Sequence, residues 1–110
     1  MEAKKLEEIS FGIVSQAGDS FSYSMEAIGL IRKNDFAKAE AKLKLAEDVL
    51  LEAHKTHSEL LFDFAQGKGI ETNILLVHAQ DHLTKAELMV IFTRENMEMK
   101  KEILNLHQTI

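Results

Sequence analysis

Apolar residues recur every three or four positions along most of the chain, with polar residues between them. This spacing is typical of amphipathic helices, and it predicts three of them, over about residues 4–32, 36–66 and 72–108. In the first, the apolar positions are Leu6, Ile9, Ile13, Ala17, Phe21, Ile28 and Ile31. In the second, the most regular, they are Phe36, Ala39, Leu43, Ala46, Leu50, Ala53, His57, Leu60 and Phe64.

Two short breaks separate the three segments. Asp35 is a candidate N-cap for the second helix, Gly67 a candidate residue just beyond its end, and Thr72 a candidate N-cap for the third. Gly18 marks either a kink in the first helix or a tolerated interior glycine. Because short connections make consecutive helices antiparallel neighbours, we expect one domain, residues 1–110, folded as an all-α, up-down-up three-helix bundle.

The third segment is apolar on two sides. One face, which should pack on the other two helices, carries Leu76, Ala79, Leu83, Ala86, Val90, Met97 and Leu104. The opposite face, here called the second stripe, carries Ile74, Val77, Leu88, Phe92, Met99 and Ile103. A helix apolar on both sides is buried on both sides, and two partner helices cover only one. The second stripe therefore predicts either another subunit or an N-terminal segment that folds back over it.

Asp81 stands in the middle of the second stripe. A carboxylate in an apolar seam needs a partner or a proton. If copies of the chain met around a symmetry axis, their Asp81 side chains could share a hard cation such as Mg²⁺. Alternatively, Asp81 lies at the edge of the seam and pairs with Lys85 one turn further on.

His78 and His82 lie one turn apart on the flank between the two apolar faces of the third segment. Spacing alone allows three interpretations: surface histidines without a role, metal ligands, or a phosphoryl acceptor. A metal site would need further ligands, for which His54 and His57 are candidates. No Glu follows His78, so the zinc-protease pattern is absent. His107, near the C-terminus, is expected to be a surface residue.

Composition narrows the class of protein. The formal net charge is −5, which argues against nucleic acid as a partner because phosphate binding needs a basic face. The chain has no cysteine, which excludes disulfides and thiol chemistry. The N-terminus lacks the apolar segment of a signal peptide, and no apolar run is long enough to span a bilayer. We therefore expect a cytoplasmic protein.

The string Val77-His78-Ala79-Gln80-Asp81-His82-Leu83 resembles the signature of the lactose/cellobiose enzyme IIA family of bacterial sugar phosphotransferase systems. The resemblance extends over most of the chain, through Gly12-Ile13 and Ala17-Gly18 in the first segment, Asn34-Asp35-Phe36 at the first turn and Glu52-Ala53-His54 in the second segment. This combination, in order and at the right spacing, favours the phosphoryl acceptor over the other two interpretations of the histidines.

The resemblance implies a homotrimer with the third helices at its centre. It implies that His78 carries the phosphoryl group, that His82 and Gln80 belong to the active site, and that three Asp81 carboxylates hold one divalent cation, Mg²⁺, at the three-fold axis. The phosphate would come from HPr and pass to the cognate enzyme IIB. The sugar would be a disaccharide of the lactose, cellobiose or chitobiose type, and contact with the membrane would be indirect, through the permease.

Two residues depart from the family pattern. His57 stands where Gln is common, which would alter the wall of the pocket, and Thr84 stands where Met is usual, which would weaken packing near the axis. Two other functions stay open. One is a metal-binding helical bundle that uses His54, His57, His78 and His82. The other is a regulatory relative that keeps the phosphorylation site but controls a partner.

Overall fold

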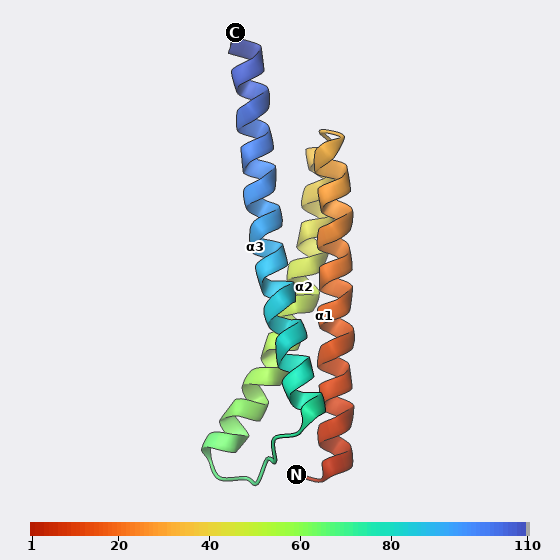
Figure 1. Ribbon diagram of the computed structural model, residues 1–110, viewed down its shortest axis with the longest axis vertical. Helices are drawn as coiled ribbons and strands as arrows, with labels where there is room; N and C mark the ends of the chain where they lie inside the picture. The colour runs from red at the N-terminus through yellow and green to blue at the C-terminus, as the bar shows by residue number, and fades with distance from the viewer. Residues whose placement is uncertain (110) are drawn as a thin grey trace.

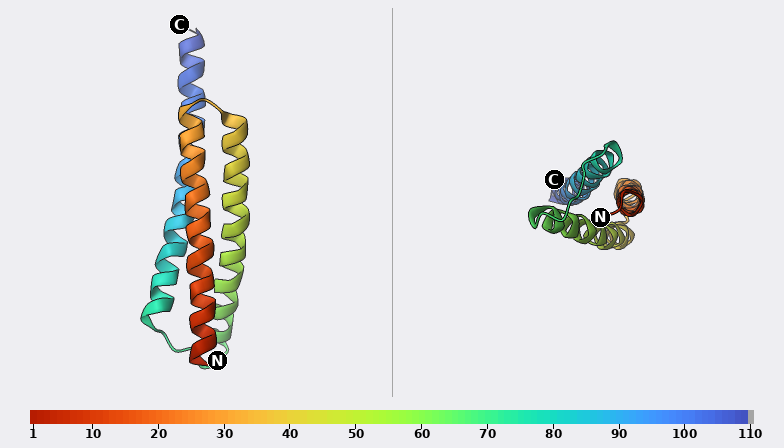
Figure 2. Two further views of the ribbon diagram at one scale, coloured as in Figure 1. Left: turned by 90° about the vertical axis from the view of Figure 1, so that its right-hand side faces the viewer. Right: turned by 90° about the horizontal axis from the view of Figure 1, so that it is seen from below.

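The computed structural model describes residues 1–109, with side chains described through His107, so that Ile110 of the expected domain lies outside the described residues. Its helices are α1 (Ala3–Arg32), α2 (Phe36–Ala65) and α3 (Ile74–Thr109), and the described residues form no strand. They run up, down and up in a slender bundle of 62 × 20 × 19 Å (Figures 1 and 2). The predicted all-α three-helix bundle is confirmed.

Both turns of the bundle are set by helix-capping residues. Asn34 adopts φ 63° and ends α1, while the Asp35 side chain accepts a hydrogen bond from the Lys38 N–H and begins α2. Gly67 ends α2 with φ 75°, a left-handed conformation that glycine adopts without steric cost. Asp35 and Gly67 therefore act as predicted.

The start of α3 differs from the expectation. The Asn73 side chain accepts a hydrogen bond from the Leu76 N–H at 2.8 Å, so that Asn73, and not Thr72, is the N-cap. The helix begins at Ile74, two residues later than expected. Asn and Thr are both favourable caps, and the sequence did not show which of these near neighbours would occupy the position.

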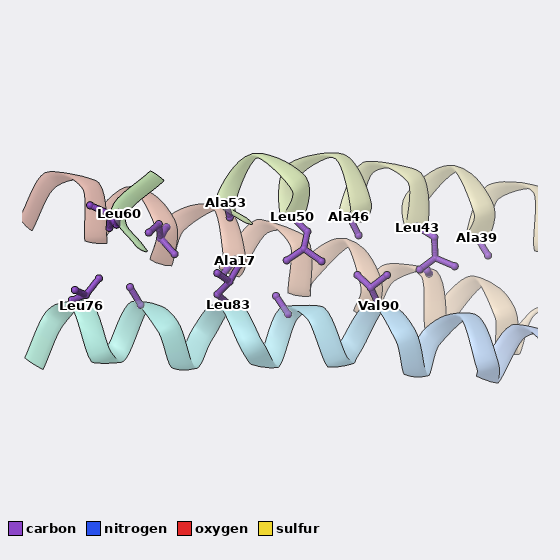
Figure 3. Packing of buried hydrophobic residues seen from close by; sticks show 14 of the residues in the cluster. Ala17, Ala39, Leu43, Ala46, Leu50, Ala53, Leu60, Leu76, Leu83 and Val90 are labelled. Atoms are coloured by element: carbon purple, nitrogen blue, oxygen red, sulfur yellow. The ribbon is translucent and has the colours of Figure 1, made fainter. Parts of the chain in front are cut away.

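The core runs along the inside of the bundle, where one face of each helix meets the other two (Figure 3). It includes most of the positions expected from the apolar register: Leu6, Ile13, Ala17, Ile31, Ala39, Leu43, Ala46, Leu50, Ala53, Leu60, Leu76, Ala79, Leu83, Ala86, Val90 and Met97. Many of these are alanines, which let the helices approach closely and leave little room for large side chains.

Two aromatic residues expected in the core lie outside it. Phe21 is 40% exposed and Phe64 is 64% exposed. On α1 the inward positions near Phe21 belong instead to Ser20 and Ser24, which are fully buried, and Ser20 donates a hydrogen bond to the Ala46 carbonyl at 2.9 Å. A small hydroxyl fits between closely packed helices where a phenyl ring would not.

α1 is one continuous helix through Gly18, so there is no break at this residue. Its N-terminal half contributes Leu6 and Ile13 to the core and does not fold back over α3. With 36 residues, α3 is longer than its 30-residue neighbours, and its C-terminal turns project beyond the α1–α2 turn (Figure 1).

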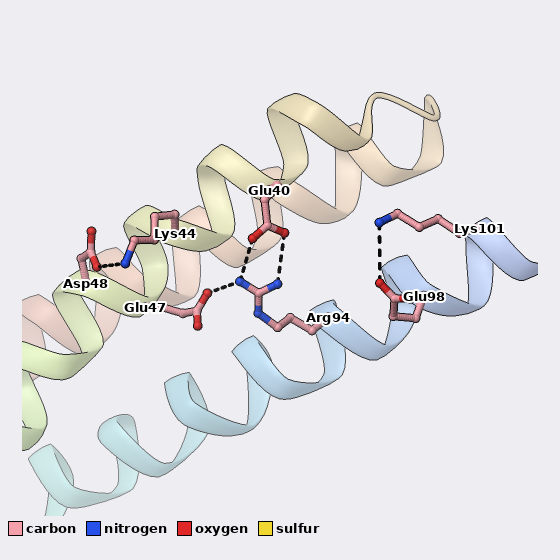
Figure 4. Close-up of polar contacts among 7 residues, drawn as sticks. All are labelled: Glu40, Lys44, Glu47, Asp48, Arg94, Glu98 and Lys101. Carbon is pink, nitrogen blue, oxygen red and sulfur yellow. Dashed lines mark hydrogen bonds and ion pairs between the residues drawn. The ribbon is translucent and has the colours of Figure 1, made fainter.

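A cluster of charges joins α2 to α3 (Figure 4). The Arg94 guanidinium donates hydrogen bonds of 3.1 and 3.0 Å to the two carboxylate oxygens of Glu40, and a further one to Glu47. This hydrogen bonding lowers the pKa of Glu40 and raises that of Arg94. The cluster ties the middle of α3 to the first half of α2, about four turns from the histidine pair.

Candidate functional site

His78 and His82 face each other on the outside of α3. Their Nε2 atoms are 3.0 Å apart, and their rings meet edge to face with centroids 4.3 Å apart. At this distance one ring donates its Nε2–H and the other accepts it through a lone pair. His78 is exposed and His82 is half-buried. The pair therefore presents one basic ring nitrogen on an accessible surface, with a hydrogen-bond donor beside it.

A groove of about 230 Å³ lies beside His82, between α1 and α3. Gly18 contributes to its wall, and a Cβ added to this glycine would meet no atom within 4 Å. The groove is therefore open at the point where α1 passes His82. Its lining residues are Ala17, Gly18, Phe21, His82 and Lys85.

Asp81 lies on the same side of α3, where its carboxylate is 2.9 Å from the Lys85 ammonium. The hydrogen bond from Lys85 lowers the pKa of Asp81, and the positive charge of Lys85 acts in the same direction. In a single chain, Asp81 is thus the partner of Lys85, one of the two arrangements expected from the sequence.

Gln80 points to the other side of α3. Its Nε2 is 3.1 Å from Nε2 of His57 on α2, so the Gln80 amide donates to a neutral His57 ring. Burial of His57, and secondarily the charge of His54, lower the pKa of His57 and favour this neutral form. Residues 78 and 80 are about 200° apart around a helix. Within one chain, Gln80 is therefore not beside His78.

His57 and Gln80 also line a second, smaller groove of about 160 Å³ between the end of α2, the connecting loop and the start of α3. The exposed Phe64 lies along this groove instead of in the core. Its lining is mainly apolar: His57, Leu60, Leu61, Phe64, Ile70, Thr72, Leu76 and Gln80.

The histidines proposed as joint metal ligands are divided among separate contacts. His54 is 3.4 Å from the Glu87 carboxylate, His57 contacts Gln80, and His78 contacts His82. Among the described residues, no group of three or more His, Cys, Asp or Glu side chains is placed to hold a metal ion. His107 is exposed near the end of α3.

The second stripe of α3 is uncovered in the single chain. Ile74 is 89% exposed and Phe92 is 62% exposed, and the other members, Val77, Leu88, Met99 and Ile103, are between 45% and 57% exposed. The alternative that the N-terminal segment covers this face is wrong, because α1 packs on the inner side of the bundle. No described helix is both long and apolar enough to cross a membrane.

Sequence reasoning did not anticipate the role of α1 in this site. The groove beside His82 depends on Gly18 and Phe21, which were assigned to a possible kink and to the core. The available signal was the low side-chain volume of Ala17-Gly18, which creates a hollow on a helix surface. Its position opposite His82 depends on how α1 and α3 align, and helical spacing does not specify that alignment.

The chain matches a model of the family described as "PTS system, Lactose/Cellobiose specific IIA subunit" over residues 8–101. A lactose-specific EIIA component of Streptococcus mutans is 34% identical over 93 residues, which are 84% of this chain and 89% of that protein. These matches confirm the family resemblance of the histidine-containing motif.

Solved structures agree with this assignment. The crystal structure of PtcA from S. mutans superposes with a TM-score of 0.89 at 35% identity, covering 92% of this chain and 99% of that one. The IIA(chitobiose) protein in a complex with HPr from Escherichia coli superposes with a TM-score of 0.78 at 28% identity, covering 94% of this chain and 98% of that one.

Proposed function

Since the chain belongs to the lactose/cellobiose-specific IIA family of the sugar phosphotransferase system, we propose that His78 is the residue through which it works as a phosphocarrier. The observation that carries this assignment is the histidine pair, with one accessible ring nitrogen and a donor 3.0 Å away. The protein is a phosphotransferase component. It takes a phosphoryl group from HPr and passes it to enzyme IIB, which phosphorylates a disaccharide of the lactose, cellobiose or chitobiose type.

In the transfer step, the lone pair on Nε2 of His78 attacks the phosphorus of phosphohistidine on HPr. The new N–P bond forms as the old one breaks, and the HPr imidazole leaves with the electron pair. The Nε2–H of His82, which first donates to His78, then donates to a phosphoryl oxygen. Such a reaction depends on positioning and electrostatics, and His82 supplies both from the next turn of the same helix.

HPr is the proposed donor because a relative of the same fold, IIA(chitobiose), forms a complex with HPr. An exposed apolar side chain beside the histidine pair suits a partner that docks and leaves: Phe21 on α1 lines the groove with His82 and is 40% exposed. This exchange takes place in the cytoplasm, and the protein meets the membrane only through the permease that its partner serves.

A homotrimer with the α3 helices at its centre would cover the second stripe. When Asp81 faces the axis, His78 lies about 60° to one side and Gln80 about 100° to the other. In a ring of three, one flank of each chain meets the opposite flank of the next. Gln80 would then join the site of a neighbouring His78, which it does not reach in its own chain.

Asp81 suits a shared cation at that axis. It is an exposed carboxylate within an apolar surface. Among the described residues of a single chain, it belongs to no group of three or more side chains that could hold a metal ion. Three copies would supply three hard oxygen ligands for one Mg²⁺. The ion would hold the subunits together by neutralising their carboxylates.

The phosphocarrier role is tested by incubating the protein with phosphoenolpyruvate, enzyme I and HPr and then measuring its mass. We expect one acid-labile phosphoryl group per chain, lost in His78→Ala and retained in the matched control His107→Ala. His82→Ala should remain folded and accept the group more slowly. Phosphorylation of His78→Ala at the native rate would show that another residue is the acceptor.

The trimer and its cation need separate tests. Subunits of His78→Ala and Gln80→Leu, mixed and refolded together, should regain activity if each site combines residues of two chains, and should not if Gln80 acts only within its own chain. Asp81→Leu should keep the trimer and abolish its dependence on Mg²⁺ in sedimentation equilibrium, because an apolar residue often replaces a buried charge without loss. A monomeric Asp81→Leu protein would contradict the arrangement.

A further inference from the structure

Lys85 is the charged residue of the groove beside His82. It lies two turns after His78 on the same flank of α3 and lines the groove beside His82. Among the described residues lining that groove, Lys85 alone carries a permanent positive charge. Side chains on a helix lean toward its N-terminus, so the Lys85 ammonium lies over the turn that carries Asp81 and His82. This brings its charge toward the histidine pair.

The present partner of Lys85 holds it weakly. The Lys85–Asp81 pair is 2.9 Å long, but the two side chains are 61% and 56% exposed. Ion pairs in such a setting are screened by water and contribute little to stability. A phosphoryl group carries more negative charge than a carboxylate and offers three acceptor oxygens. It would therefore compete well with Asp81 for the ammonium.

The site also needs a cation for electrostatic reasons. The phosphoryl group would form on His78 at the mouth of the groove beside His82. His82 offers one N–H donor there. Without Lys85, no side chain with a permanent positive charge would face the anionic product among the residues that line the groove.

We propose that Lys85 is a phosphoryl-binding residue, which exchanges the Asp81 carboxylate of the single chain for a phosphoryl oxygen on His78, to which it donates a charge-assisted hydrogen bond while Asp81 is engaged at the trimer axis. This rests on the proposed function of His78. No covalent step is added: one ion pair replaces another. Bound in this way, the ammonium favours the phosphorylated form of the protein and so shifts the equilibrium of transfer from HPr.

The equilibrium between phospho-HPr and this protein measures the effect. Lys85→Gln removes the charge and keeps a polar, unbranched side chain, and we expect it to shift the equilibrium at least about tenfold away from phosphorylated His78, the usual scale of a hydrogen bond to a charged group. Lys85→Arg should restore most of the loss. The matched control is Lys44→Gln, since Lys44 forms an equally long i,i+4 pair with Asp48 at 2.9 Å, on α2; it should leave the equilibrium unchanged.

A second variant separates phosphoryl binding from simple neutralisation of Asp81. If Lys85 only offsets the carboxylate, adding Lys85→Gln to Asp81→Asn should not change the equilibrium measured for Asp81→Asn alone, and that result would overturn the proposal, as would an unchanged equilibrium in Lys85→Gln alone. A further loss of the same size in the Asp81→Asn background would support it, because any effect of Asp81→Asn on the assembly is common to both proteins. A wild-type protein that accepts no phosphate from HPr would instead refute the proposed function itself, and this inference with it.

Discussion

Phe92→Asp is the sharpest test of how the second stripe is used. Phe92 lies near the centre of the stripe and is 62% exposed in the single chain. Its ring contributes little to the fold of the monomer, because most of it faces outward. The substitution should therefore leave each chain folded while placing a carboxylate in the seam that three α3 helices would share.

The magnitude follows from the exposed fraction. Full burial of a Phe side chain is worth roughly 1.5–3 kcal/mol, and about two-thirds of this remains available for association, or about 1–2 kcal/mol per chain. Three chains give about 3–6 kcal/mol per trimer, which at about 1.4 kcal/mol per factor of ten is a loss of roughly 10²–10⁴ in the association constant. The cost of burying three carboxylates adds to this loss.

Sedimentation equilibrium over a range of protein concentrations measures the association constant. Phe11→Asp is the matched control, since Phe11 is 61% exposed but lies on α1, outside the second stripe. We expect a trimeric wild type and control and a largely monomeric, still helical Phe92→Asp. Less than a tenfold change for Phe92→Asp, or equal changes for both variants, would refute the assignment of this face to the subunit interface.

Three further predictions concern the single chain, each measured by urea unfolding. Arg94→Met should lower the free energy of unfolding by only about 1 kcal/mol, because the Arg94 side chain is 37% exposed and its ion pairs are partly screened. Arg94 lowers the pKa of Glu40 in the folded chain, so the wild type loses this stabilisation as the pH falls below about 4.5, and the variant should lose less stability over the same range. Leu43→Ala should cost about 2–5 kcal/mol, since Leu43 is fully buried, whereas Leu51→Ala, at a 67% exposed position, should cost less than about 0.5 kcal/mol. The depressed pKa of His57 means that the folded chain binds fewer protons than the unfolded one just below about pH 6.5. Stability should therefore fall as the pH drops through this range, and His57→Gln should remove part of that fall; an unchanged pH dependence would contradict the neutral, amide-bound ring.

Helical spacing predicted the three helices and most of the core, because burial of one face decides both. The prediction from spacing was wrong where either of two neighbouring residues could occupy a position in the core. Phe21 is more hydrophobic than Ser20, yet Ser20 is buried because the helices approach too closely for a phenyl ring. Hydrophobicity ranks residues by the gain from burial and carries no information on the space between two helices.

The relative positions of the candidate residues around α3 were predicted, because spacing along one helix fixes their angles. His78 and His82 share a flank of α3, and Asp81 lies in the adjoining second stripe. Contacts between helices were not predicted: Gln80 with His57, or Arg94 with Glu40 and Glu47. Such contacts depend on how far one helix is shifted and rotated relative to the next, and a single sequence does not specify either quantity.

The sides of α3 differ in what they contact. One side packs on α1 and α2, and the opposite side carries the exposed second stripe. The polar residues of the proposed site are confined to the two narrow flanks between them. His78, His82 and Lys85 occupy one flank, and Gln80 occupies the other. Since each flank borders both apolar faces, a partner that covers the second stripe would also enclose the flanks, which links assembly of the subunits to the environment of the phosphoryl group.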